Sequence, residues 1–223
     1  MSESISGNPI GPDGYPRPSV TADVVVWSAI QGTPHILLIR RRHWPYENCW
    51  ALPGGFLDIT ETLEEAARRE LAEETGLTVS ILEPLLPFDA PERDPRKRVI
   101  TMAYLALVPN AKAVAPVEAG DDAIDAQWWP FLEMPELAFD HDQIIVAAQR
   151  HLRRRLLGDD LGRHLMPAPF DEPMLADVIQ QWLGESPDTE RVLKLLLAAG
   201  VIEPVDERHY RYRELEAQAW PYF

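Results

Sequence analysis

Apolar and polar positions follow two different periods along the chain, and the change between the periods marks the expected elements. Runs that are apolar, or that alternate with period two, predict strands. These runs lie at 20–30, 35–42, 79–86, 99–108 and 123–131. The turn residues Gln31 to Pro34 join the first pair. The segment from Arg42 to Gly55 and the charged segment 89–98 are expected to be loops.

Two segments have the helical period instead. Between Leu63 and Thr75 apolar residues recur every four positions among helix formers, and Gly76 follows at the place of a C-terminal cap. From His141 to Leu157 apolar residues gather on one side and arginines lie elsewhere, as in an amphipathic helix that closes a domain. Strands that alternate with helices indicate an α/β or α+β sandwich.

Breaks in this periodicity divide the chain into parts. Gly, Pro and like charges interrupt the pattern after the second helix and predict a linker. Beyond the linker, short helices are expected at 174–182 and 188–198, and a small hairpin at 201–202 with 209–213, an arrangement that resembles a winged helix. The predicted parts are a flexible N-terminal segment at 1–18, a main domain at 19–157, the linker at 158–169 and a winged-helix-like domain at 170–223.

Composition narrows the class of protein. The 223 residues are 46% hydrophobic, which is enough for a core, and the formal net charge of −15 opposes binding to a nucleic-acid backbone or an anionic lipid surface. Cys49 is the single cysteine, so an internal disulfide is impossible and a reducing compartment is expected. The N-terminus lacks the pattern of a signal peptide, and no apolar stretch is long enough to span a membrane. We therefore expect a cytoplasmic protein without membrane contact.

Three acidic residues at the end of the first predicted helix point to chemistry. Glu70 and Glu74 are one helical turn apart and Glu73 is beside both, so their carboxylates crowd together. Each like-charged pair costs about 0.2–0.5 kcal/mol in an isolated helix, and the negative end of the helix dipole adds to the cost. A divalent cation removes both penalties. Hard oxygen donors of this kind suit Mg²⁺ or Mn²⁺.

The alternative for a helix rich in glutamate is a solvated face that makes ion pairs one turn apart. The spacings Glu64 to Arg68 and Glu65 to Arg69 fit that alternative. It does not extend to the three acidic residues that follow, because no Lys or Arg comes three or four residues after any of them. Arg69 is expected on another face of the helix.

The acidic residues belong to a longer pattern between Gly55 and Leu77. The fixed positions of this pattern are Gly55, Glu61, Arg69, Glu70, Leu71, Glu73, Glu74, Gly76 and Leu77. The segment resembles the Nudix box of the Nudix hydrolases, in which all nine positions recur. The resemblance implies a Nudix α/β/α sandwich with a mixed sheet, and Mg²⁺-dependent cleavage of a pyrophosphate bond. It further implies that Arg69 pairs with Glu61 to hold the preceding loop against the helix.

Site residues follow from the box and its neighbours. The expected metal ligands are Gly55, Glu70, Glu73 and Glu74, and the expected catalytic residues are Glu73, Glu74, Asp121 and Asp122. Family members differ in the residue that takes the proton, which is a box glutamate or an acid on a later loop. Here the loop 117–122 offers Glu118, Asp121 and Asp122, and the alternative for these three is a polar surface turn.

Substrate contacts are expected from the segment before the box. Gly54 allows a close approach of the backbone to a ligand. The arginines at 40–42 end an apolar strand, from which a guanidinium can reach phosphate; we expect Arg40 and Arg42 to do so, and the alternative is a basic strand end that faces solvent.

Further segments resemble the ADP-ribose pyrophosphatase-like branch of the family, and this resemblance extends over about residues 18 to 157. They are RPSVTADVVVW, PERDPRKR before VITMAYLALV, and GDDAIDAQWWPF with FDHDQII. The resemblance implies hydrolysis of ADP-ribose to AMP and ribose 5-phosphate. Relatives are commonly homodimers, although the sequence itself does not determine the oligomeric state.

The same branch contains transcriptional regulators of NAD metabolism, in which a winged helix that binds DNA follows a Nudix domain that senses ADP-ribose. DNA is therefore an alternative partner. Residues 160–223, however, contain 12 Asp or Glu against 6 Lys or Arg, which opposes phosphate contacts. An inactive Nudix module that only binds its ligand is disfavoured too, since all three box carboxylates are present. An enzyme is the preferred interpretation.

Overall fold

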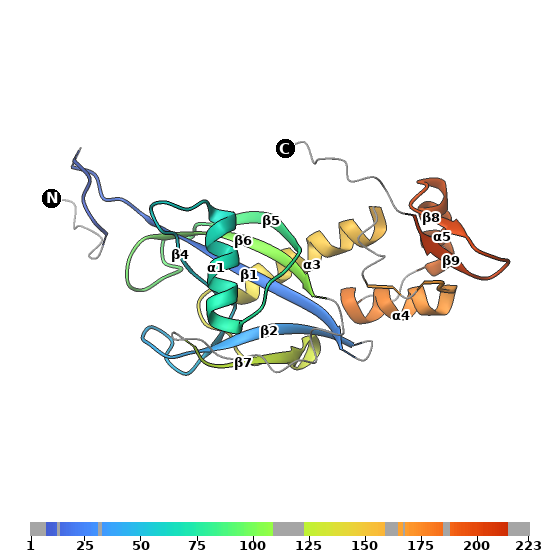
Figure 1. Cartoon of the computed structure of the whole chain (residues 1–223), viewed down its shortest axis with the longest axis horizontal. Coiled ribbons are helices and arrows are strands. Elements are labelled where there is room, and N and C mark those ends of the chain that lie inside the picture. The colour runs from blue at the N-terminus through green and yellow to red at the C-terminus, as the bar shows by residue number, and fades with distance from the viewer. Residues whose placement is uncertain are drawn as a thin grey trace. The chain divides into compact units, whose positions relative to one another are not determined.

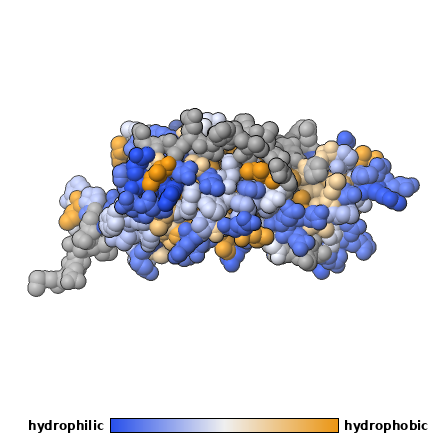
Figure 2. Space-filling model, turned by 90° about the horizontal axis from the view of Figure 1, so that it is seen from below, coloured by the Kyte–Doolittle hydropathy of each residue, from blue (hydrophilic) through white to orange (hydrophobic). Residues whose placement is uncertain are grey.

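The computed structural model describes residues 8–12, 14–30, 33–108, 123–158, 165–166, 168–184 and 188–213. The chain divides into two compact units, Met1–Ala148 and Gln149–Phe223 (Figure 1). Within the described residues, no helix has the length and apolar character needed to cross a membrane. Apolar side chains on the face in Figure 2 form small separate patches between hydrophilic ones.

The first unit is built on a mixed sheet of seven strands. They are β1 (Ser19–Ile30), β2 (Thr33–Arg41), β3 (Trp50–Ala51), β4 (Gly54–Phe56), β5 (Ile81–Phe88), β6 (Val99–Val108) and β7 (Ala123–Pro130). β1 runs parallel to β6, and the other pairs are antiparallel. All five predicted strands are confirmed. The expectation that 42–55 is entirely loop is wrong, because the short β3 and β4 lie within it.

β1 changes partners along one edge, and this change makes room for a site. Near its end β1 pairs with β2, with Trp27 opposite Ile36. Near its start it pairs with β4, with Asp23 opposite Gly54. The far end of β2 pairs with β3 instead, while β7 pairs with β2 from His35 to Arg41. The two long strands therefore separate between Asp23 and the end of β2.

The predicted helix α1 (Leu63–Thr75) is confirmed and covers one face of the sheet (Figure 1). A capping box between Thr62 and Glu65 satisfies its first turn, and Gly76 ends it in the left-handed conformation at φ 68°. Alanine side chains on its buried side are small, so the helix can lie close to the sheet. The packed residues are Ala66, Ala67 and Leu71 from the helix, and Ala22, Val24, Val26, Leu37, Tyr104, Ala106 and Val108 from the sheet.

Helix α3 (His141–Gly158) follows the short η1 (Phe131–Glu133) and begins on the other face. Its first residue contacts the backbone of Leu52 and lies near Asp23, whose side chain points away from α1 because strand side chains alternate. The predicted sandwich with a mixed sheet is therefore confirmed for this unit.

The second unit contains α4 (Glu172–Leu183), α5 (Thr189–Ala198) and a hairpin of β8 (Ile202–Pro204) and β9 (Tyr210–Tyr212). Asp171 and Asp188 cap the two helices. Phe170 is fully buried and its backbone pairs with Tyr210 at the hairpin. Two helices and a hairpin agree with the winged-helix-like arrangement expected from the sequence.

Candidate active site

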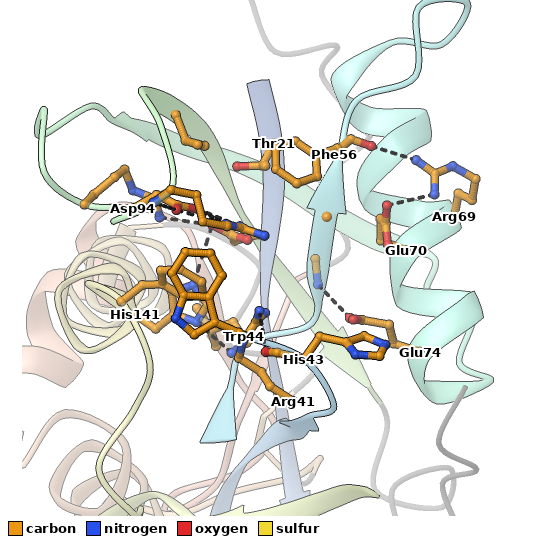
Figure 3. A pocket seen from close by; sticks show the side chains of 18 of the residues that line it. Thr21, Arg41, His43, Trp44, Phe56, Arg69, Glu70, Glu74, Asp94 and His141 are labelled. Atoms are coloured by element: carbon orange, nitrogen blue, oxygen red, sulfur yellow. Dashed lines mark hydrogen bonds and ion pairs between the residues drawn. The ribbon is translucent and has the colours of Figure 1, made fainter. Parts of the chain in front are cut away.

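A cavity of about 330 Å³ opens in the first unit where β1 and β2 separate. Its walls come from β1, the end of β2 and the loop after it, β4, α1, the loop 89–98 and the start of α3. Figure 3 shows Glu70 and Glu74 on one side of it, and Asp94 and His141 on the other. Its volume lies within the range of small-molecule sites.

Gly54 and Glu74 fix one wall of the cavity. The Gly54 N–H donates to Glu74 Oε2 at 2.8 Å, and only 7% of Glu74 is exposed. Burial, together with the negative charges of Glu70 and Asp23, raises the pKa of Glu74 to about 8. Gly54 has φ 153°, and a Cβ there would lie 2.3 Å from the carbonyl oxygen of Ala22. Only glycine fits at this position.

The lack of a side chain at Gly55 determines where the Glu70 carboxylate lies. A Cβ on Gly55 would lie 2.4 Å from the Glu70 carboxylate, so the absence of a side chain lets that carboxylate rest against the Gly55 backbone. A carboxylate beside a backbone carbonyl is a pair of hard oxygen donors, which divalent cations prefer.

Arg69 ties the preceding loop to the helix. Its guanidinium donates to Glu61 at 2.6 and 3.0 Å and to the Phe56 carbonyl at 3.0 Å. The bonds from Arg69 to Glu61, with a further bond from the Asp58 N–H, lower the pKa of Glu61 to about 2. The same group also donates to Glu70 at 2.8 Å and to Glu73 at 3.1 Å. The expectation that Arg69 lies away from the acidic trio is therefore wrong: the sequence argument considered basic residues after each glutamate and not those before it.

The three box carboxylates have different surroundings. Glu70 and Glu74 line the cavity, whereas the Glu73 side chain is 60% exposed beside Arg69. Among the residues that the structure describes, no group of three or more acidic, His or Cys side chains converges on one point. A cation such as Mg²⁺ takes one or two carboxylates and completes its shell with water and phosphate oxygens. Glu70 and Glu74, with the Gly55 backbone, fit this requirement.

Arg41 is the arginine of its segment that lines the cavity. Arg40 donates instead to the Asn48 carbonyl at 3.1 Å, and Arg42 to the Ala123 carbonyl at 3.0 Å. Side chains alternate along a strand, and the pairing of β2 with β7 is also irregular between Arg40 and Arg41. The positions of Arg40 and Arg42 thus give no support to their expected contact with substrate.

A buried cluster of charges forms the wall beside α3. Arg93 donates to Asp140 at 2.7 and 3.1 Å and to Asp23 at 3.4 Å. His141 Nδ1 accepts from the Leu52 N–H at 2.9 Å, so a neutral ring carries its proton on Nε2, which lies 3.9 Å from Asp23. Complete burial lowers the pKa of His141 and favours this neutral form.

Sequence reasoning assigned no role to these cluster residues. One signal was available, because Asp23 is a charged residue inside an otherwise apolar strand. Arg93 and Asp140 are distant in sequence, and nothing local indicates that they meet. The catalytic candidates Glu118, Asp121 and Asp122 lie outside the described residues.

Known proteins share both the motif and the fold. The NUDIX domain model matches residues 18–148. An ADP-ribose pyrophosphatase from Methanocaldococcus jannaschii is 40% identical over 131 residues, which are 59% of this chain and 73% of the relative. The ADPR responsive transcriptional repressor NtrR from Acinetobacter baylyi is 32% identical over 198 residues, which are 86% of this chain and 78% of the repressor.

A solved structure agrees with these matches. The NUDIX domain of Shewanella oneidensis NrtR, in complex with ADP ribose, superposes with a TM-score of 0.58 at 32% identity and covers 64% of this chain and 93% of that domain. The sequence match extends over more than half of the chain and includes the whole box. The chain belongs to the Nudix hydrolase family, in its ADP-ribose pyrophosphatase-like branch.

Proposed function

We propose that this protein hydrolyses the pyrophosphate bond of ADP-ribose, with Mg²⁺ as cofactor, to give AMP and ribose 5-phosphate. The observation that carries the proposal is the pair of carboxylates, Glu70 and Glu74, set against the Gly54–Gly55 backbone in a cavity that arginines also line. The similarity to an ADP-ribose pyrophosphatase supports the choice of substrate.

Glu70, Glu74 and the Gly55 carbonyl would hold the cation. When bound, it supplies positive charge that offsets the charge developing on the leaving phosphate, and it makes the attacking water more acidic. Arg41 and Arg96 line the same cavity and would bind the diphosphate oxygens. Arg69 orients Glu70 from outside the reacting centre.

Which residue accepts the proton of the attacking water remains a prediction from the sequence. Glu73, Glu74, Asp121 and Asp122 are the candidates, with Glu118 as a further acid on the same loop. Exchange of each for alanine identifies the acceptor by a fall in turnover number with little change in KM. Unchanged turnover in every loop variant would leave the role to a box glutamate.

The test of the whole proposal is a substrate panel with product analysis by mass. The wild-type chain and Glu74→Gln are compared with ADP-ribose, NADH, diadenosine polyphosphates and nucleotide sugars, each with Mg²⁺ and with a chelator. We expect AMP from ADP-ribose in the wild type alone, and only with the metal. Equal rates in the two proteins would overturn the metal assignment.

Regulation of transcription is a second candidate, since similarity to the repressor extends over 86% of the chain. Ion pairs within the second unit weigh against it. Lys194 on α5 is paired with Glu190, and Arg211 and Arg213 on the hairpin are paired with Glu203. Fewer Lys and Arg side chains of the second unit then remain to contact the phosphates of DNA. A mobility-shift assay with DNA upstream of the gene, at moderate salt, decides between the two: specific retardation that ADP-ribose releases would favour the repressor.

We also propose a cytosolic location and a homodimer. The thiol of Cys49 is free, as expected in a reducing compartment. Light scattering on the purified chain measures the mass in solution, and a monomer at micromolar concentration would contradict the dimer.

A further inference from the structure

Trp44 is an exposed aromatic side chain on the wall of the cavity. It lies in the loop between β2 and β3, and 67% of it is exposed. Figure 3 shows its ring in front of the cavity, near Arg41 and His43. A ring of this size offers a flat apolar face on which another aromatic group can pack.

The other large aromatic rings of the cavity already have partners. The Phe56 ring faces the Lys97 ammonium at 4.4 Å and the Arg96 guanidinium at 5.4 Å. The Phe139 ring faces the guanidinium of Arg41 at 4.9 Å. Phe139 also packs against Tyr46, with ring centroids 4.7 Å apart. Both rings therefore already interact with other side chains of the fold.

Trp44 differs in this respect. In the part of the chain that the structure describes, no ring or cation packs on its indole. The rest of the cavity wall is rich in carboxylates and arginines, which suit phosphate and metal.

Arg41 holds the loop around Trp44 in place. Its Nε donates to the Pro45 carbonyl at 2.9 Å and its Nη2 to the His43 carbonyl at 3.4 Å, so the bonds reach both neighbours of Trp44. Arg41 itself lines the cavity. Arg41 at the end of β2 and the exposed Trp44 ring in the following loop are thus held in one segment of the cavity wall.

We propose that the nucleobase of the substrate stacks on Trp44. This inference rests on the proposed function and deepens it, because it assigns the cavity to substrates with an aromatic base. Stacking tolerates different bases, since every base has a π-face. Trp44 therefore favours ligands that carry a nucleobase over ligands that carry none, whichever base it is.

The experiment measures binding rather than turnover. Isothermal titration with Mg²⁺ present gives the Kd of AMP, which has a base, and of ribose 5-phosphate, which has none, for the wild type, Trp44→Ala and Trp44→Phe. Trp44→Ala should weaken AMP by about tenfold, which is typical of the loss of one stacked base. Trp44→Phe should restore most of the affinity, and ribose 5-phosphate should bind all three proteins alike.

Two further readouts separate stacking from a structural role. AMP should quench a part of the tryptophan fluorescence that Trp44→Phe lacks. Tyr15→Ala, which removes an aromatic side chain that is 70% exposed outside the cavity, serves as the matched control and should bind AMP as the wild type does. A wild type that binds AMP but leaves ADP-ribose intact would refute the proposed function and leave this inference standing.

Three results would overturn the inference. Equal AMP affinity in the wild type and Trp44→Ala would show that no base contacts the ring. An equal loss for AMP and ribose 5-phosphate would assign Trp44 to the shape of the loop. A change of solution mass in Trp44→Ala with unchanged AMP affinity would assign the ring to an interface between copies of the chain.

Discussion

Exchange of Arg93 for methionine is expected to destabilise the first unit strongly. The Arg93 side chain is 4% exposed and provides the positive charge between Asp23 and Asp140, which are themselves 9% and 11% exposed. Methionine fills much of the volume but leaves two buried carboxylates without a cation. Removal of one partner from a buried ion pair costs about 3–5 kcal/mol, and two abandoned anions place this case toward the upper end.

The assay is thermal unfolding followed by circular dichroism, with Arg40→Met as control. A domain of this size loses about 2–4 °C per kcal/mol, so the midpoint should fall by roughly 6 to 20 °C. Arg40 is exposed, and its variant should change stability by about 0.5 kcal/mol or less. The double variant with Asp140→Asn should recover part of the loss, since it removes one unpaired charge. A midpoint within about 2 °C of the wild type for Arg93→Met would refute the argument, since that shift corresponds to no more than about 1 kcal/mol.

Three other predictions concern the box and its helix. Gly55→Ala should keep the fold but displace Glu70 and lower Mg²⁺-dependent hydrolysis by about 10- to 100-fold. Gly54→Ala should also lower the unfolding midpoint, because the added Cβ would collide with backbone atoms of β1. Activity measurements and melting curves together distinguish the two variants. Thr62→Ala removes the capping box and should cost about 1 kcal/mol in thermal unfolding, with no change expected in KM. The pKa of Glu61 is about 2 in the folded chain against an ordinary value of 4.5, so its stabilisation is full above about pH 4.5 and is lost as the pH falls toward 2; Glu61→Gln should flatten melting midpoints across that interval.

The long elements were predictable because their signals are local. The helix 63–75 shows its cap residues, its period and its C-terminal glycine within one segment, and β1 and β6 are long and mostly apolar. β3 and β4 were not predictable. They have two and three residues, too few to show a period, and they exist because the longer β1 and β2 provide edges for them.

The residues of the site also include some that the sequence could predict and some that it could not. Spacing within one helix placed Glu70 and Glu74 together, but the inward member of 40–42 depends on the register of β2 against its neighbours. A shift of one residue reverses every side chain of a strand, so sequence alone could not select Arg41. The meeting of Arg93 with Asp140 is harder still, because it joins segments 47 residues apart.

The buried charge of Glu74 opposes folding, which is itself informative. Glu74 is buried next to other carboxylates, and its raised pKa is the direct sign that its charged form is unfavourable there. An apolar or amide side chain would occupy the same space without that penalty, and the Gly54 N–H would still find an acceptor in glutamine. Because local choices that lower stability concentrate where a ligand is bound, the burden of anions is best explained by a cation that neutralises them. The same argument does not extend to Asp23, whose charge Arg93 already balances within the fold.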